Sequence, residues 1–296
     1  MQKNILLFVL SLFLLSCTSG KVVKNTENNN HYEVTRSDNQ KAVLVLFPCF
    51  PCDIEHTKAE AGFLKSIEKE GVTTILLDYN QKLFLKESEK KEYAAVLNSI
   101  FDQHHIDKAN VFIGGFSSGG NVALLLSSFL IKNENAIQPK GLLVVDSPVD
   151  LEQLYHNAEK DVAANVDPDA VEEGKFLIGL FDQELGKPDE NPATYKTASP
   201  YLMTSNSVEN IQYLKNIKTR FYCEPDLDWQ QQNKGRKFED LNAFVLKKAN
   251  EALVNLGNHT AEYIETKNRG IRANGKKHPH SWNIVEQKGL VKWMLE

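Results

Sequence analysis

Short, continuous runs of apolar residues alternate along most of the chain with longer segments in which apolar residues recur every three or four positions. The continuous runs contain many β-branched residues, which is typical of strands that are buried on both faces of a sheet. They lie at 41–48, 72–80, 109–116 and 141–148, and two more polar stretches at 219–225 and 260–267 are also expected to be strands. The segments with helical spacing lie at 56–71, 88–106, 117–132, 238–257 and 281–296. This alternation predicts an α/β fold with a mostly parallel central sheet and helices on both faces.

Two segments depart from this alternation. The stretch 31–36 is short and alternates in polarity, so we expect it to be an antiparallel edge strand. The stretch 151–215 is acidic and helix-like and contains no strand-like run, which predicts a helical cap insertion within one domain spanning 31–296. The aromatic side chains of the insertion either line a substrate pocket or pack the cap on the body. They are Tyr155, Phe176, Phe181, Tyr195 and Tyr201.

The first 17 residues carry a targeting pattern. An apolar run at 5–15 follows Lys3, is too short to span a bilayer as a stable helix, and ends at Leu-Leu-Ser-Cys. The pattern resembles the signal peptide of bacterial lipoproteins, in which a small residue precedes an acceptor cysteine. The resemblance implies removal of residues 1–16 and attachment of acyl chains such as palmitate to Cys17, with more than one chain needed for stable anchoring. The alternative is a plain signal peptide with a chance cysteine.

Residues 18–30 are polar and rich in asparagine, so 17–30 is interpreted as the lipidated cysteine followed by a flexible tether. The expected location is therefore an exported, membrane-anchored lipoprotein at the outer membrane or periplasmic face of a bacterial cell envelope. The whole chain has a formal net charge of −5, with 42% hydrophobic and 25% charged residues. These values suit a globular domain and argue against a nucleic-acid partner.

A glycine-rich turn joins the strand 109–116 to the helix 117–132. Residues 115–119 read Gly-Phe-Ser-Ser-Gly, a G-x-S-x-G pattern with a strand before it and a helix after it. That setting is typical of a nucleophile elbow, in which a strained turn exposes the hydroxyl of Ser117 at a helix N-terminus. A Walker A loop would need a lysine that is absent, and a dinucleotide-binding turn would need G-x-G-x-x-G near the chain start. A merely structural glycine turn is the remaining alternative.

A nucleophilic serine needs a base and an orienting acid. The strand 219–225 ends in a stretch that reads Glu-Pro-Asp-Leu-Asp at 224–228. Residues 276–282 read Lys-Lys-His-Pro-His-Ser-Trp and supply two histidines, His278 and His280. The order serine, acid, histidine along an α/β chain resembles that of the α/β-hydrolase superfamily, over the whole chain from about residue 31. The resemblance implies an α/β-hydrolase fold and a serine esterase.

Matched residue by residue, the resemblance implies that Ser117 is the nucleophile and His280, beside the start of the last helix, is the base in preference to His278. Asp226 is the favoured acid because it follows its strand by a few residues. Three other carboxylates stay open as the acid; they are Asp228, Glu224 and Asp146.

The same resemblance implies an oxyanion hole made of two backbone amides. One is the amide of Ser118, which follows the nucleophile, and the other comes from the loop after strand 41–48. That loop, Phe-Pro-Cys-Phe-Pro-Cys-Asp at 47–53, is similar to the His-Gly-Phe-Pro-Gly loop of the superfamily and puts the second donor at the amide of Phe50. Cys49 and Cys52 stand in place of both glycines.

Cys49-Phe-Pro-Cys52 is also a C-x-P-C pattern, which favours a thiol-redox protein as a competing hypothesis or a disulfide across this loop. The function indicated by the whole pattern is a membrane-tethered serine hydrolase that cleaves small-molecule carboxylic esters through an acyl-enzyme, with no metal or organic cofactor. A non-catalytic binding lipoprotein on the same fold is the other alternative, since fold alone does not fix function.

Overall fold

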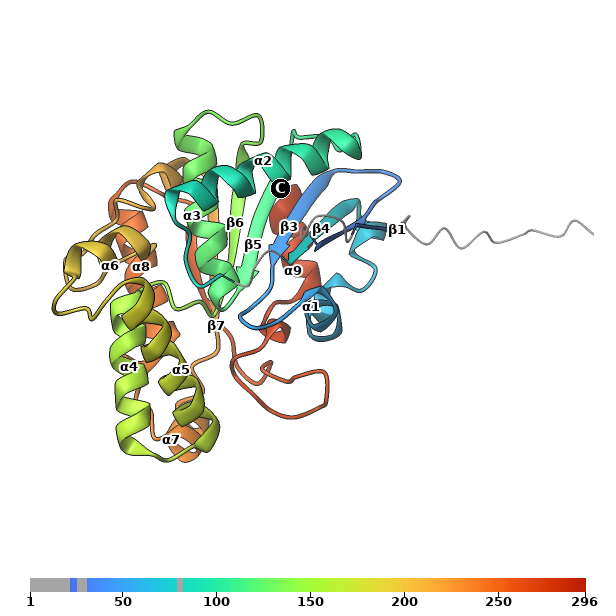
Figure 1. Cartoon of the computed structure of the whole chain (residues 1–296). Coiled ribbons are helices and arrows are strands. Elements are labelled where there is room, and N and C mark those ends of the chain that lie inside the picture. Colours follow the sequence, from blue (N-terminus) through green and yellow to red (C-terminus); the bar gives the residue numbers. More distant parts are fainter. Residues whose placement is uncertain (1–21, 26–30, 79–81) are drawn as a thin grey trace, which may run out of the picture.

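An eight-stranded sheet forms the centre of the part of the chain that the computed structural model describes, which is residues 22–25, 31–78 and 82–296 (Figure 1). Its strand order is β1-β2-β4-β3-β5-β6-β7-β8. The strands are β1 (Val22–Asn25), β2 (His31–Thr35), β3 (Ala42–Phe47), β4 (Val72–Asp78), β5 (Val111–Phe116), β6 (Pro139–Val145), β7 (Lys218–Cys223) and β8 (Ala261–Glu265). Strands β3 to β8 are parallel, whereas β1 and β2 pair antiparallel.

The helices of the described residues connect these strands. The α-helices are α1 (Ile54–Glu60), α2 (Glu87–Gln103), α3 (Ser118–Lys132), α4 (Leu151–Ala164), α5 (Pro168–Glu184), α6 (Pro192–Ala198), α7 (Leu227–Lys234), α8 (Asn242–Asn255) and α9 (Gln287–Leu295). The 3₁₀ turns are η2 (Gly62–Leu64), η3 (Ile67–Glu70), η4 (Gln212–Asn216), η5 (Phe238–Asp240) and η6 (Trp282–Ile284). In these elements the predicted fold class is confirmed: a mostly parallel sheet with helices on both faces and a helical insertion.

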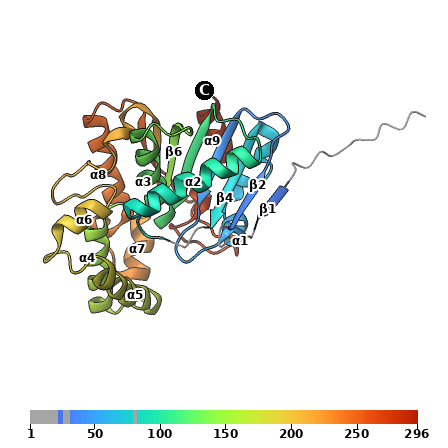
Figure 2. The ribbon, with the colours of Figure 1, turned by 45° about the horizontal axis from the view of Figure 1, so that its top comes forward.

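Two apolar cores cover the two faces of the sheet. Successive side chains of a strand point to opposite faces, and β3 shows this directly. Val43, Val45 and Phe47 belong to the core that contains α2, α3 and α8, while Leu44 and Leu46 belong to the core that contains η2, η3 and α9. Figure 2 shows α2 and α3 on one side of the sheet and α9 on the other. A continuous apolar run is therefore needed at β3, because neither face is open to water.

Four single elements differ from the sequence prediction. The segment 31–36 is not the edge of the sheet, because β1 pairs with β2 within a stretch expected to be a tether. The expected helix 56–71 is divided into α1, η2 and η3, and the expected helix 281–296 is divided into η6 and α9. Helix α7 was not predicted, because its sequence Leu-Asp-Trp-Gln-Gln-Gln-Asn-Lys lacks an apolar face. No helix among the described residues is both long and apolar enough to cross a membrane.

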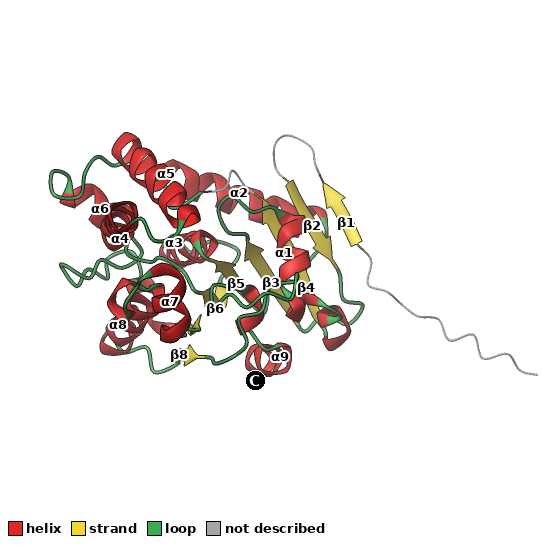
Figure 3. Cartoon of the chain, turned by 90° about the horizontal axis from the view of Figure 1, so that it is seen from below, coloured by secondary structure: helices red, strands yellow, loops and turns green. Residues whose placement is uncertain are grey.

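The insertion between β6 and β7 contains α4, α5 and α6 and lies beyond one end of the sheet (Figures 1 and 3). Tyr155, Phe181 and Tyr195 form its centre, with ring centroids 6.2 to 6.4 Å apart. All three are almost fully buried, as is Tyr201. Of the aromatic side chains considered for a pocket, these four therefore pack the cap, and Phe176 is the exception at 46% exposed.

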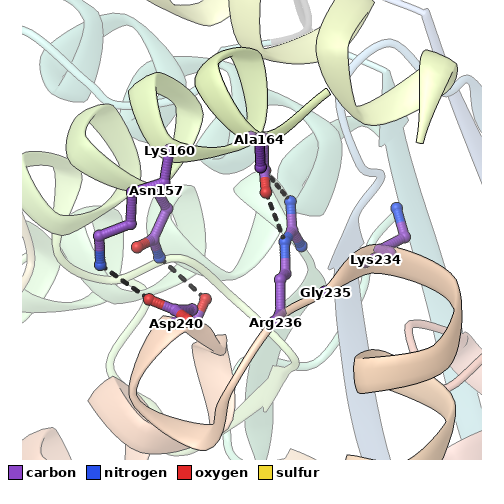
Figure 4. Close-up of a pocket in the computed structure, with 8 residues that line it drawn as sticks. Asn157, Lys160, Ala164, Lys234, Gly235, Arg236 and Asp240 are labelled. Carbon is purple, nitrogen blue, oxygen red and sulfur yellow. Dashed lines mark hydrogen bonds and ion pairs between the residues drawn. The ribbon is translucent and has the colours of Figure 1, made fainter. Parts of the chain in front are cut away.

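Polar contacts join the cap to the segment that follows α7. Figure 4 shows the hollow between them, where the side chains of Asn157 and Lys160 on α4 reach Asp240. Lys160 Nζ lies 2.7 Å from Asp240 Oδ1, and the Asn157 amide donates to the Asp240 carbonyl oxygen at 2.8 Å. Because the charges that line this hollow are paired within the protein, we interpret it as a cap-to-body contact.

Arg236 makes the most buried of these contacts, a two-pronged ion pair with Asp161 in which Nε lies 3.1 Å from Oδ1. Replacing Arg236 with methionine leaves the Asp161 carboxylate, which is 11% exposed, without its partner. We expect a loss of about 1.5–3 kcal/mol in the free energy of unfolding. Urea unfolding measures it, and adding Asp161→Asn to the variant should recover part of the loss. Equal stability of wild type and Arg236→Met would contradict this account.

Candidate active site

Ser117 lies at the sharp turn between β5 and α3. Its backbone has φ of 54° and ψ of −127°, which a residue with a side chain adopts only under strain. The Ser117 amide donates to the Val145 carbonyl oxygen at 2.9 Å, and its carbonyl accepts from the Gly120 amide at 3.0 Å. The residue is half-buried, and α3 begins directly after it. This is the geometry of a nucleophile elbow at a helix N-terminus.

The glycines of the turn are required by close backbone contacts. A Cβ at Gly115 would lie 2.1 Å from the Gly119 carbonyl group, and one at Gly119 would lie 2.4 Å from the carbonyl oxygens of Phe47 and Pro48. No side chain fits at either distance. The G-x-S-x-G pattern is therefore explained by the turn itself, which brings α3 against the end of β3.

His280 is paired with Asp146. His280 Nδ1 lies 2.6 Å from Asp146 Oδ2, across 134 positions of sequence. The imidazole also lies against the ring of Phe116, with centroids 4.3 Å apart. Phe116 directly precedes Ser117, and the Ser117 amide donates to Val145, which directly precedes Asp146. Ser117, His280 and Asp146 therefore lie together at the ends of β5 and β6.

The pairing leaves Nε2 as the nitrogen of His280 that can exchange a proton. An ionised carboxylate accepts the Nδ1 proton and thereby fixes the tautomer. Among the described residues no hydrogen bond joins the Ser117 hydroxyl to His280. Proton transfer between them therefore stays a prediction of the sequence analysis.

The favoured acid, Asp226, does not contact His280, and this part of the prediction is corrected to Asp146. Asp226 is the N-cap of α7, where its carboxylate accepts from the Trp229 amide at 3.3 Å. Lys277 Nζ lies 2.5 Å from its other oxygen. Asp226 was chosen because it follows a strand at the usual interval, but the unpredicted helix α7 begins there and uses the carboxylate as a cap.

Glu224 has a structural role in the loop that leads to His280. Its buried carboxylate accepts from the Thr266 hydroxyl and from the amides of Arg269 and Gly270, at 2.9 to 3.0 Å. The Gly270 carbonyl in turn accepts from the His278 amide at 2.7 Å. Glu224 therefore holds the loop in place, and Asp228 lies in the first turn of α7.

His278 belongs to the same loop and is partly buried beside Arg272. Burial, reinforced by the positive charge of Arg272, lowers the pKa of His278 to about 3. Its Nδ1 lies 3.1 Å from the carbonyl oxygen of His280, so the ring orders the backbone that carries the candidate base. Its ring also contacts Trp229 of α7, with centroids 4.9 Å apart.

This shift predicts a dependence of stability on pH. The pKa of a histidine in an unfolded chain is about 6.5, so below that pH the unfolded state takes up a proton that folded His278 does not. Its contribution to stability is therefore complete above about pH 6.5 and falls as the pH drops towards the folded pKa. We expect His278→Gln to lose less stability than wild type between pH 6.5 and about pH 4, measured by urea unfolding.

The matched control is His156→Gln, a change in a histidine that is exposed on the cap and paired with Glu159. This variant should keep the pH dependence of wild type. Identical pH dependence in wild type and His278→Gln would show that His278 does not resist protonation in the folded state.

The loop after β3 reaches over the start of α3. Cys49 and Cys52 form a disulfide, and the Cys52 amide donates to the Cys49 carbonyl oxygen at 2.8 Å. Phe50 lies between the two cysteines, and its amide donates to the Ser118 Oγ at 2.8 Å. The two amides expected to form the oxyanion hole thus belong to residues that are in direct contact.

Two further features surround this loop. The ring of Phe50 stacks on that of Phe176 from α5, with centroids 5.3 Å apart and an angle of 20° between the planes. Cys49, Cys52 and His56 place one ligand atom each within 4.8 Å of one another, which would suit a metal ion if both cysteines were thiolates. In the structure the two sulfur atoms are bonded to each other.

Comparison with known proteins agrees with this architecture. A family model described as alpha/beta hydrolase fold matches residues 88–212. No curated protein matches the sequence. Carboxyl esterase 2 from Tuber melanosporum has a similar structure, with a TM-score of 0.58 and 16% identity over 93% of this chain and 84% of that one. So has an esterase of the bacterial hormone-sensitive lipase family, with a TM-score of 0.57 and 13% identity over 94% of this chain and 83% of that one.

A structure of fungal esterases from Rhizomucor miehei is also similar, with a TM-score of 0.59 and 10% identity over 93% of this chain and 82% of that one. The chain is thus an α/β-hydrolase-fold protein, as its sequence predicted.

Proposed function

We propose that the chain is a serine hydrolase of small-molecule carboxylic esters, with Ser117 as nucleophile, His280 as base and Asp146 as orienting acid. The observation that carries the proposal is the strained elbow at Ser117 beside the His280–Asp146 pair. A histidine–carboxylate pair next to a half-buried serine hydroxyl is the arrangement that activates a serine. The solved structures of similar fold are described as esterases, which supports an ester as the substrate.

The residues define a two-step reaction. Ser117 Oγ attacks the ester carbonyl carbon while its proton passes to His280 Nε2, and the carbonyl oxygen becomes an oxyanion. Collapse of this intermediate breaks the bond to the alcohol, which leaves with the proton from His280. Water then attacks the acyl-enzyme, gives a proton to His280, and releases the carboxylic acid as Ser117 recovers its proton.

The direct test is turnover of p-nitrophenyl acetate, butyrate and octanoate by the full-length protein in detergent. Wild type should hydrolyse at least one of the three, and His280→Ala should lose nearly all of that activity. His156→Ala, which removes an exposed histidine from the cap, should keep it. Wild type that hydrolyses none of these esters faster than buffer would overturn the proposal.

We also propose that the chain is anchored to a membrane through Cys17. This residue lies outside the described residues, so the support is the sequence pattern Leu-Leu-Ser-Cys alone. Full-length protein expressed in a bacterium with labelled palmitate should take up the label, and Cys17→Ala should not. Cys223→Ala, a change at a buried free cysteine, is the control and should be labelled like wild type. Equal labelling of Cys17→Ala would show that this cysteine is not the acceptor.

A further inference from the structure

The side chain of Ser118, the residue after the candidate nucleophile, contacts the loop after β3. Ser118 is the first residue of α3 and is only 1% exposed. Its Oγ accepts the amide proton of Phe50 at 2.8 Å, across 68 positions of sequence. The hydroxyl is therefore a fixed part of the region where the oxyanion of the proposed reaction would form.

This bond changes how the Phe50 amide can act. A backbone N–H has one proton, and in the structure that proton is directed at Ser118 rather than towards open space. A serine hydroxyl has one proton and two acceptor lone pairs. Accepting from Phe50 leaves the Ser118 proton free to be donated, and no acceptor for it is found among the described residues.

We propose that the Ser118 hydroxyl donates a hydrogen bond to the oxyanion, which makes it the second direct donor of the oxyanion hole beside the Ser118 amide. This inference rests on the proposed function. The Phe50 amide then acts through Ser118, because a hydroxyl that accepts a hydrogen bond becomes a stronger donor. No bond is made or broken at Ser118, and its proton is shared with the oxyanion and retained.

The surroundings of Phe50 suit this role. The disulfide between Cys49 and Cys52 closes the loop on both sides of Phe50. The Phe50 ring stacks on that of Phe176, which belongs to the cap, and this contact restricts the movement of Phe50. Donors that are fixed before the reaction stabilise a developing charge without reorganising, and burial keeps water from competing. The direction of the Phe50 amide, and hence the orientation of Ser118, is set by the loop before substrate binds.

Three substitutions at Ser118 test the inference. Ser118→Ala removes the hydroxyl, Ser118→Cys keeps the shape with a weak S–H donor, and Ser118→Thr keeps the hydroxyl. We expect kcat for p-nitrophenyl ester hydrolysis to fall by about 10²-fold in the alanine and cysteine variants, with KM within about threefold of wild type. The threonine variant should stay within about tenfold of wild type.

A readout specific to the oxyanion separates this role from a structural one. A trifluoromethyl ketone forms a tetrahedral adduct with a nucleophilic serine, so its inhibition constant should rise by the same factor by which kcat falls. The control is Ser127→Ala, which removes another buried hydroxyl from the same helix, one that has no hydrogen-bond partner. That variant should match wild type in every measurement.

Several outcomes would overturn the inference. Wild-type kcat in both Ser118→Ala and Ser118→Cys would show that the hydroxyl only fills the site, and faster turnover would show that it competes with substrate for the Phe50 amide. A fall in kcat without a matching loss of trifluoromethyl ketone affinity would show a structural role. Failure of the proposed function is distinguishable, because wild type itself would then show neither turnover nor inhibition.

Discussion

Replacing Ser117 with alanine should lower kcat for ester hydrolysis by several orders of magnitude, on the order of 10⁵-fold or more. The change removes the only atom that attacks the carbonyl in the proposed reaction, while the backbone of the turn can persist. A double variant with His280→Ala should lose little more, because the nucleophile and base act as a unit. Steady-state hydrolysis of p-nitrophenyl butyrate measures both, and Ser127→Ala serves as the control.

Residual activity within tenfold of wild type in a folded Ser117→Ala protein would exclude Ser117 as the nucleophile. The fold would stand in that case, since it depends on the strands and on Gly115 and Gly119 rather than on the serine hydroxyl. A non-catalytic binding role for the same site would then be the better account.

Replacing Asp146 with asparagine should cost about 10⁴-fold in kcat, because an amide at this position can hold the His280 ring in the wrong tautomer and cannot balance the charge of the imidazolium. Asp226→Asn is the matched variant, at the end of the neighbouring strand. It keeps a side chain that can cap α7 and removes the ion pair with the exposed Lys277, so we expect kcat within tenfold of wild type and only a small loss of stability. Kinetics and urea unfolding of both variants give the comparison.

The opposite pattern, with a large loss in Asp226→Asn and a small one in Asp146→Asn, would restore Asp226 as the acid. Equal small losses would mean that His280 works without a carboxylate partner. The comparison is informative because both side chains follow parallel strands that are neighbours in the sheet, and only one of them reaches His280 Nδ1.

The central strands and the turn at Ser117 could be predicted because local sequence determines them. Strands β3 and β5 are continuous apolar runs that are buried on both faces, and the glycines of the turn have no sterically allowed substitute. The position of His280 between the last strand and the last helix could also be predicted. Each of these features is readable within about ten residues of sequence.

The acid could not be predicted with the same certainty because its role depends on packing between distant segments. Asp146 directly follows β6, which pairs with the strand that leads to Ser117, and this adjacency was the available signal. Asp226 was the favoured acid because of its interval from β7. The sequence around it shows no helix periodicity, so neither α7 nor the role of Asp226 as its N-cap could be predicted. A carboxylate that ends a strand can serve a helix, a lysine or a histidine, and only the tertiary structure decides which.

The contact between Phe50 and Ser118 could not be predicted either, because it also depends on packing between distant segments. Both residues were expected to contribute backbone amides, and the amide of one instead meets the side chain of the other. The disulfide between Cys49 and Cys52 was one of two meanings left open for the C-x-P-C pattern. Sequence spacing alone cannot separate a loop-closing disulfide from a redox pair.

The most direct test of the central claim is the reaction of the full-length protein with a fluorophosphonate, followed by mass spectrometry of the labelled peptide. The reagent phosphonylates only a serine whose hydroxyl is activated, and it needs no knowledge of the natural substrate. The account predicts a single modification, located on Ser117, that is absent in Ser117→Ala and much slower in His280→Ala and Asp146→Asn. Wild-type protein that stays unlabelled, or that is labelled on a different residue, would contradict it.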